Sequence, residues 1–190
     1  GGRVSPPLPP HAMPTTPLPR QPAPDLTVDT LDGETWRLAD QSPEAFTLVV
    51  AYRGLHCPVC KSYLETLSEV RGEYAERGVE VIAVSMDSAA RARKARMDWA
   101  VEGVPIGYGM SEATARAWGL YLSEGVKDSE PDLFSEPGLF LVRPDGPLYY
   151  AAVNSAPWGR PHLPSFVKTV DFILEKDYPA RGEVAERQPA

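Results

Sequence analysis

The sequence predicts an α/β fold in which one mixed β-sheet carries helices on both faces. Two continuous apolar runs, FTLVVAYR from Phe46 and VEVIAVSM from Val79, are typical of strands buried on both sides, and each is followed by a segment with helical periodicity. Two later runs, GLFLVR and PLYYAAV, flank Pro144-Asp145-Gly146, which is a hairpin signal. The first half therefore needs parallel strands joined by helical crossovers, and the second half adds antiparallel strands.

The first elements can be placed in order along the chain. Residues 26–30 and 35–38, joined by Asp32-Gly33, are expected to form an amino-terminal hairpin. Residues 46–53 are expected at the centre of the sheet. Apolar side chains at steps of three and four residues then predict a helix from Pro58 to about Gly78; they are Cys60, Tyr63, Leu64, Leu67, Val70 and Tyr74.

The second half of the chain follows the same logic. After a strand that begins at Val79, Asp87 and Ser88 are placed to cap a helix that extends to about Val101. A short strand at 104–108, a helix at 111–118 and an acidic loop at 122–136 come next. The hairpin around Asp145 precedes a last helix, which the pattern places at residues 163–176.

Composition indicates one domain with a complete hydrophobic core. The chain has 190 residues, of which 43% are apolar and 24% are charged. We expect the domain to span residues 22–178. Residues 1–21 should be a proline-rich, extended arm that is mobile unless a partner or the domain surface holds it, and residues 179–190 a flexible tail.

Charge and hydropathy exclude two classes of partner. A net charge of -7 gives no broad electrostatic reason to bind nucleic acid, and no apolar run approaches the length of a membrane span. No continuous apolar stretch follows a basic start, so a secretory signal is not expected in this sequence. We therefore expect a cytoplasmic protein with neither a nucleic-acid nor a membrane partner.

The segment RGLHCPVC, which begins at Arg53, contains the two cysteines of the chain. Cys57 and Cys60 lie where the first long strand gives way to its helix. Unpaired N–H groups and the positive end of the helix dipole favour a thiolate there, and Pro58 suits the first helical position. We expect Cys57 to be the nucleophile and Cys60, one helical turn further on, to be its buried resolving partner.

Metal binding is the main alternative for the two cysteines. A tetrahedral zinc site needs four ligands, whereas the chain offers two thiols and the histidines at positions 11, 56 and 162. We therefore expect neither a metal nor another cofactor within one chain. A zinc or iron–sulfur site shared between two chains stays open. His56, next to Cys57, either modulates the charge of the thiol or is a solvated side chain.

These residues carry a resemblance to a known family. RGLHCPVC and the later EPGLFLV resemble the thioredoxin superfamily, and PAPDLTVDTLDGETWRL resembles the amino-terminal hairpin of its peroxiredoxin branch, the alkyl hydroperoxide reductase/thiol-specific antioxidant (AhpC/TSA) family. The resemblance covers residues 22–176 and implies a thioredoxin-like fold with an amino-terminal hairpin extension. It also implies that Pro137 is a cis-proline lying against the cysteine pair; a trans proline that starts a strand is the alternative.

The sequence departs from the pattern that the resemblance implies. Gly54 stands where peroxiredoxins have Thr or Ser, Val50 where they have proline, and Pro137 where they have an arginine. Without that hydroxyl and guanidinium, no residue of the pattern aligns and polarises a peroxide. Arg53 and Arg160 are candidate substitutes if the fold brings them near the cysteines.

Thioredoxins proper differ in other ways. They carry a tryptophan where this chain has His56, and a buried acid in the preceding strand, which has none here. Glu136 is then a candidate to take the proton of Cys60. Trp158, next to Arg160 in a proline-rich turn, is a candidate wall of a substrate groove.

The expected function is thiol–disulfide exchange by the Cys57/Cys60 couple. The expected substrate is a protein or low-molecular-weight disulfide, and an external thiol system would regenerate the dithiol. One alternative is a peroxidase that reduces hydroperoxides through a Cys57 sulfenic acid. Another is a non-catalytic redox sensor or scaffold whose proline-rich arm binds a partner. The oligomeric state is open, a homodimer included.

Overall fold

The strand that leads to the two cysteines is β3 (Phe46–Ala51), and all six of its residues are buried. In the computed structural model, which describes residues 16–185, β3 pairs in parallel with β4 (Val79–Val84) and antiparallel with β8 (Gly138–Val142). Neighbours on both edges and cover on both faces explain its unbroken apolar run. β3 lies one place from the centre of the sheet, a position that β4 takes instead.

The sheet has seven strands and is mixed, as predicted. β3, β4 and β5 are mutually parallel, and the outer strands are antiparallel to their neighbours. The order across the sheet is β2 (Thr35–Arg37), β1 (Thr27–Thr30), β5 (Ile106–Tyr108), β4, β3, β8 and β9 (Leu148–Val153). A short 3₁₀ turn, Leu38–Asp40, follows β2.

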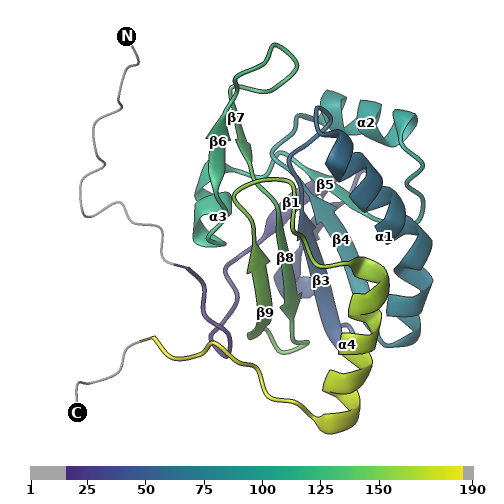
Figure 1. Cartoon of the computed structure of the whole chain (residues 1–190), viewed down its shortest axis with the longest axis vertical. Coiled ribbons are helices and arrows are strands. Elements are labelled where there is room, and N and C mark those ends of the chain that lie inside the picture. The colour runs from purple at the N-terminus through teal and green to yellow at the C-terminus, as the bar shows by residue number, and fades with distance from the viewer. Residues whose placement is uncertain (1–15, 186–190) are drawn as a thin grey trace.

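Helices cover both faces of the sheet, as predicted. α1 (Pro58–Glu76), α2 (Ala89–Asp98) and α4 (Leu163–Lys176) pack on one face, and α3 (Glu112–Ala117) packs on the other (Figure 1). The alternation of β3 serves both layers, because Leu48 and Val50 face α1 while Val49 and Ala51 face the α3 side. Among the described residues, no helix has both the length and the apolarity that a membrane crossing requires.

The acidic segment 122–136 is not a continuous loop, so that prediction was wrong. It forms a separate two-stranded hairpin, β6 (Leu122–Glu124) and β7 (Leu133–Ser135), which projects from the top of the molecule in Figure 1. Phe134 and Ser135, on opposite faces of β7, are both buried, and this burial stabilises the hairpin. The acidic residues gather in and near the connection between the strands, which hid the two short apolar stretches in the sequence pattern.

Both ends of the described chain are held against the domain. Arg20 N–H donates to the Leu148 carbonyl at 2.8 Å, and Arg20 Nε donates to the Ala180 carbonyl at 3.0 Å. Ala180 itself is buried. Contacts with the domain thus extend past both of the boundaries placed at 22 and 178. Residues 1–15 of the proposed arm, its partner-binding role and residues 186–190 of the tail lie outside the described residues.

Candidate active site

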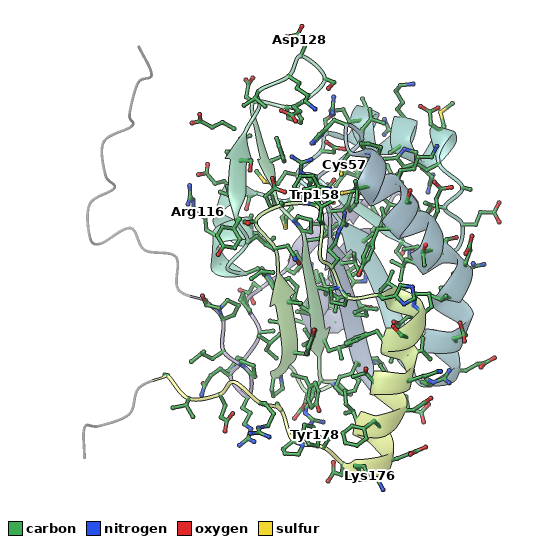
Figure 2. All side chains as sticks on the ribbon, in the orientation of Figure 1. Cys57, Arg116, Asp128, Trp158, Lys176 and Tyr178 are labelled. Atoms are coloured by element: carbon green, nitrogen blue, oxygen red, sulfur yellow. The ribbon has the colours of Figure 1, made fainter. Side chains whose placement is uncertain are left out.

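Cys57 and Cys60 meet where β3 ends and α1 begins, as the sequence predicts. Cys57 is the cap residue of α1, and its Sγ accepts a hydrogen bond from the backbone N–H of Cys60 at 3.2 Å. Pro58 occupies the first helical position and is exposed. Figure 2 shows Cys57 at the upper end of the sheet, beyond the carboxyl end of β3. Both thiols are reduced, with 1% of Cys57 and 0% of Cys60 exposed.

The two thiols differ in acidity. Hydrogen bonds from the Cys60 side chain and backbone, and the nearby Arg53 guanidinium, lower the pKa of Cys57 to about 6 in spite of its burial. Burial and the neighbouring Cys57 sulfur raise the pKa of Cys60 well above its usual range. Cys57 is therefore the thiolate near neutral pH and Cys60 the protonated partner.

Arg53 lies beside Cys57 and belongs to a charged cluster. Its Nε is 3.0 Å from Glu136 Oε2, an ion pair rather than a well-directed hydrogen bond, and its guanidinium lies 4.8 Å from the centre of the Phe134 ring. Ser123 donates a hydrogen bond to the other oxygen of Glu136 at 2.8 Å. The β6–β7 hairpin thus supplies one wall of the site. Arg53 was a candidate from the sequence if the fold brought it near the cysteines. It does lie there, and it supplies a cation next to the Cys57 thiolate.

We expect the alkylation rate of Cys57 by iodoacetamide to rise with pH through a midpoint of about 6, because only the thiolate reacts. Replacing Arg53 with methionine removes a positive charge that favours the thiolate, so the midpoint should move to higher pH. Mass spectrometry of the singly alkylated protein across a pH series measures both midpoints. An Arg53→Met profile identical to that of the parent would show that Arg53 does not act on this sulfur.

Arg160 reaches the other sulfur of the pair. It lies on the connection between β9 and α4, 100 residues from Cys60, and its Nη2 is 3.1 Å from Cys60 Sγ. Its Nε donates to the Pro157 carbonyl at 2.9 Å, and its guanidinium stacks 4.4 Å from the centre of the Tyr63 ring. The fold therefore brings together both arginines that the sequence offered, one at each cysteine.

Gly54 occupies the place of the missing Thr or Ser because an acid fills the space beside it. Its φ is +136°, and a Cβ there would lie 2.5 Å from Asp87 Oδ1. The buried Asp87 carboxylate accepts the Leu55 N–H at 2.8 Å and pairs with Arg91 at 3.2 Å, which fixes the turn that presents Cys57. Of the two residues expected to cap α2, Ser88 does so, whereas the Asp87 side chain serves the active-site turn.

His56 is half-buried beside Cys57 but makes no hydrogen bond with it. Its ring lies edge-on to Phe134, with centres 4.6 Å apart, and neither ring nitrogen has a hydrogen-bond partner among the described residues. Burial and the charge of Arg53 lower the pKa of His56, so the ring is neutral near pH 7. A neutral ring cannot stabilise the Cys57 thiolate through charge.

The peptide bond that precedes Pro137 is trans, which corrects the cis geometry implied by the resemblance. The next residue, Gly138, already pairs with Ala51 at the end of β3, so the chain enters β8 directly. The alternative, a trans proline at the start of a strand, is what the structure contains. This segment contributes Glu136 to the site. The Glu136 carboxylate forms an ion pair with Arg53, whereas the sequence had made it a candidate to take the proton of Cys60.

An open apolar groove of about 360 Å³ lies beside the first turn of α1; Val59 and Arg160 line it, and neither cysteine does. Val59, between the two cysteines, and Tyr63 form one side, and Trp158, which is 70% exposed, forms part of the other with Arg160. Trp158 thus lies where a substrate-groove wall was expected. A larger hollow of about 740 Å³ is lined by residues that include Thr47 and Val79 at the far ends of β3 and β4, and neither cysteine is among them.

Polar atoms without partners gather around the cysteines. Among the described residues, six buried side-chain nitrogen and oxygen atoms lack a hydrogen bond, and all belong to Arg53, His56, Ser135, Glu136 or Arg160. Such atoms are rare in folded proteins and mark places that a polar ligand or water completes. The places of Asp87, Phe134 and Ser135 at the site could not be predicted from the sequence, because contacts between distant segments leave no periodic signal.

Comparison with known proteins agrees with this geometry. The model of the AhpC/TSA family matches residues 19–151. A peroxiredoxin-like protein from Aquifex aeolicus has a TM-score of 0.65 at 17% identity, covering 82% of this chain and 86% of its own. The mitochondrial 2-Cys peroxiredoxin of Plasmodium falciparum has a TM-score of 0.68 at 18% identity, covering 89% and 100%. A search of curated protein sequences found no match.

Proposed function

Because this chain belongs to the AhpC/TSA family, and is accordingly a thiol-dependent oxidoreductase with a thioredoxin-like fold, we propose that Cys57 and Cys60 form a dithiol couple that reduces disulfides. The opposite acidity of the two thiols carries the proposal. Cys57 is a thiolate held by an N–H at a helix start, and Cys60 is protonated one helical turn away. An attacking sulfur and a resolving sulfur need this asymmetry.

The cycle has two exchange steps. The Cys57 thiolate attacks one sulfur of the substrate disulfide, the substrate S–S bond breaks, and the leaving thiolate takes up a proton. Cys60 then loses its proton and attacks the Cys57 sulfur. The mixed disulfide breaks, the second substrate thiolate leaves and is protonated, and Cys57–Cys60 becomes the oxidised disulfide. Two electrons pass from the couple to the substrate, and an external thiol reductant returns them.

The groove beside the pair supports a substrate with an apolar portion next to its disulfide. Its lining is largely apolar, and the exposed Trp158 offers a wide flat surface for contact. Neither cysteine lines the groove, but Val59, between the two cysteines, and Arg160, in contact with Cys60, both do, so a group bound there would lie next to the turn that carries the pair. A low-molecular-weight disulfide or an extended peptide fits this arrangement better than a compact protein surface does, because Cys57 is only 1% exposed.

Peroxide reduction is the second candidate, and the burial of Cys57 favours it specifically. A hydroperoxide is small enough to approach a sulfur that is 1% exposed, and the Arg53 guanidinium lies beside that sulfur. The thiolate would attack the terminal peroxide oxygen, the O–O bond would break, and an alcohol or water would leave after protonation. Cys60 would then condense with the Cys57 sulfenic acid and release water, which gives the same disulfide.

Stopped-flow oxidation of the fully reduced protein separates the two candidates. Hydrogen peroxide and the neutral disulfide 4,4′-dithiodipyridine are compared at equal concentration, with free thiols counted before and after. We expect the disulfide to oxidise both thiols rapidly and hydrogen peroxide to react at about the rate of an unactivated thiol, because no hydroxyl stands at Gly54 to align the peroxide. A peroxide reaction several orders of magnitude faster than that reference would establish the peroxidase instead.

A further inference from the structure

Resolution by Cys60 poses an electrostatic problem that this fold must solve. Cys60 is fully buried, and burial raises its pKa, yet the sulfur must become negative before it can attack. β3, which precedes the pair, contains no acid or base that could assist. Glu136, the candidate named from the sequence, makes its ion pair with Arg53. A different group must therefore stabilise negative charge on Cys60.

Arg160 is the cation in direct contact with that sulfur. Its Nη2 lies 3.1 Å from Cys60 Sγ, a hydrogen-bonding distance for a guanidinium and sulfur. Within residues 16–185, no carboxylate forms an ion pair with Arg160, and its buried Nη1 has no hydrogen-bond partner. A half-buried guanidinium without a counter-ion favours a negative charge nearby, and Cys60 Sγ is the group in place to carry it.

The loop that carries Arg160 is fastened to the same helix as Cys60. Tyr63 donates a hydrogen bond to the Pro161 carbonyl at 2.6 Å, and the Tyr63 ring stacks under the guanidinium at 4.4 Å. The Arg160 Nε is fixed to Pro157 at 2.9 Å. These contacts restrain the guanidinium, so directing Nη2 at Cys60 Sγ costs less entropy than ordering a free side chain would.

We propose that Arg160 is the positioning residue of the resolving step: it orients Cys60 Sγ and stabilises the negative charge on that sulfur as it attacks the mixed disulfide on Cys57. The two arginines then divide the work, Arg53 acting on the attacking sulfur and Arg160 on the resolving one. The new S–S bond joins Cys60 to Cys57, the bond from Cys57 to the substrate breaks, and the departing substrate sulfur takes the proton that Cys60 has lost to solvent. This inference rests on the proposed function.

The charged and titratable groups around Cys60 define what a pH series will report. They are Arg160 from the loop before α4, Arg53 and Tyr52 from the turn after β3, and Cys57 at the start of α1. Burial raises the pKa of Tyr52, so this phenol stays neutral across the useful pH range. Arg53 is retained in every Arg160 variant. A shift in the resolution profile that appears only when Arg160 is changed therefore reports Arg160.

One equivalent of 4,4′-dithiodipyridine tests the proposal on the full, reduced chain. Attack by Cys57 releases the first thiopyridone and resolution by Cys60 releases the second, so two optical phases follow the two sulfurs. The probe is uncharged, so loss of an arginine does not alter its attraction to the site. We expect Arg160→Met to leave the first phase within about twofold, to slow the second about tenfold or more, and to move its pH midpoint upward. Arg160→Lys should recover part of the second phase.

Arg143→Met is the matched control, because this arginine also stacks on a tyrosine, with its guanidinium 4.8 Å from the Tyr149 ring, but lies at the other end of β8. It should leave both phases unchanged. An unaltered second phase in Arg160→Met would overturn the proposal, as would equal slowing of both phases that lysine does not relieve. If Arg160→Met does not fold, the comparison of Arg160→Lys with Arg160→Gln takes its place. Equal second-phase rates and pH midpoints in these two variants would also overturn the proposal.

The Cys60→Ser variant separates this proposal from the proposed function. If Cys60 resolves, that variant releases only one thiopyridone, and an unaltered Arg160→Met second phase would then refute the role of Arg160 alone. If Cys60→Ser still releases two, Cys60 is not the resolving sulfur and the proposed function itself fails.

Discussion

Replacing Cys57 with serine is expected to abolish turnover, whereas replacing Cys60 with serine should leave the first attack intact and trap the substrate on Cys57. A serine hydroxyl stays protonated near neutral pH, so the nucleophile is lost and turnover should fall by at least about three orders of magnitude. In Cys60→Ser the Cys57 sulfur still forms a mixed disulfide, but no second sulfur displaces the substrate. Intact mass spectrometry, which measures the mass of the adduct, identifies the trapped species.

The Cys60→Ser variant also tests the origin of the thiolate. The Cys60 thiol and backbone N–H both donate to Cys57 Sγ and lower the pKa of Cys57; serine keeps the N–H and supplies a hydroxyl donor. The trapped adduct should therefore form at a rate close to that of the first phase in the parent protein. Equal loss of activity in both variants, with no adduct on Cys57, would reverse the assignment of the two sulfurs.

The sheet and the cysteine pair were predictable because they depend on local signals. Unbroken apolar runs marked β3 and β4, helical periodicity marked α1, and a proline after Cys57 marked the helix start. These patterns reflect burial and helix geometry at adjacent positions, so one sequence suffices to find them. The mixed sheet followed from which connections were long enough for a crossover.

The contacts that tune the pair were not predictable in detail. Arg53 and Arg160 were both named as candidates, but only the folded chain places the first beside Cys57 and the second beside Cys60. Arg160 and Cys60 are 100 residues apart, and no periodicity links them. Phe134 escaped notice because β6 and β7 are three residues each, too short for alternation to stand out among acidic neighbours.

Gly54 shows how such a contact can explain a departure from a family pattern. A hydroxyl-bearing residue cannot stand there, because its Cβ would meet the Asp87 carboxylate at 2.5 Å and because φ is +136°. Asp87 in turn accepts the Leu55 N–H at 2.8 Å, so the carboxylate takes over the support of the turn. Restoring the hydroxyl alone would therefore displace that support, and would not recreate a peroxidase site.

Replacing Gly54 with alanine is accordingly expected to lower the free energy of unfolding by about 3 kcal/mol or more, through backbone strain and displacement of the buried Asp87 carboxylate together. Gly146→Ala is the control, because Gly146 has a φ of +110° and its Cβ would meet no atom within 4 Å. Strain alone should cost that variant about 1–2 kcal/mol. Urea unfolding of both variants measures the difference.

The difference should depend on Asp87 and should reach Cys57. In a double-mutant cycle, adding Asp87→Ala to Gly54→Ala should destabilise the protein less than the sum of the single changes, because the clash disappears with the carboxylate. Gly54→Ala should also slow the alkylation of Cys57, since Leu55 loses the acceptor that holds the turn. Equal unfolding free energies for Gly54→Ala and Gly146→Ala, or additive effects with Asp87→Ala, would mean that backbone conformation alone requires glycine at position 54.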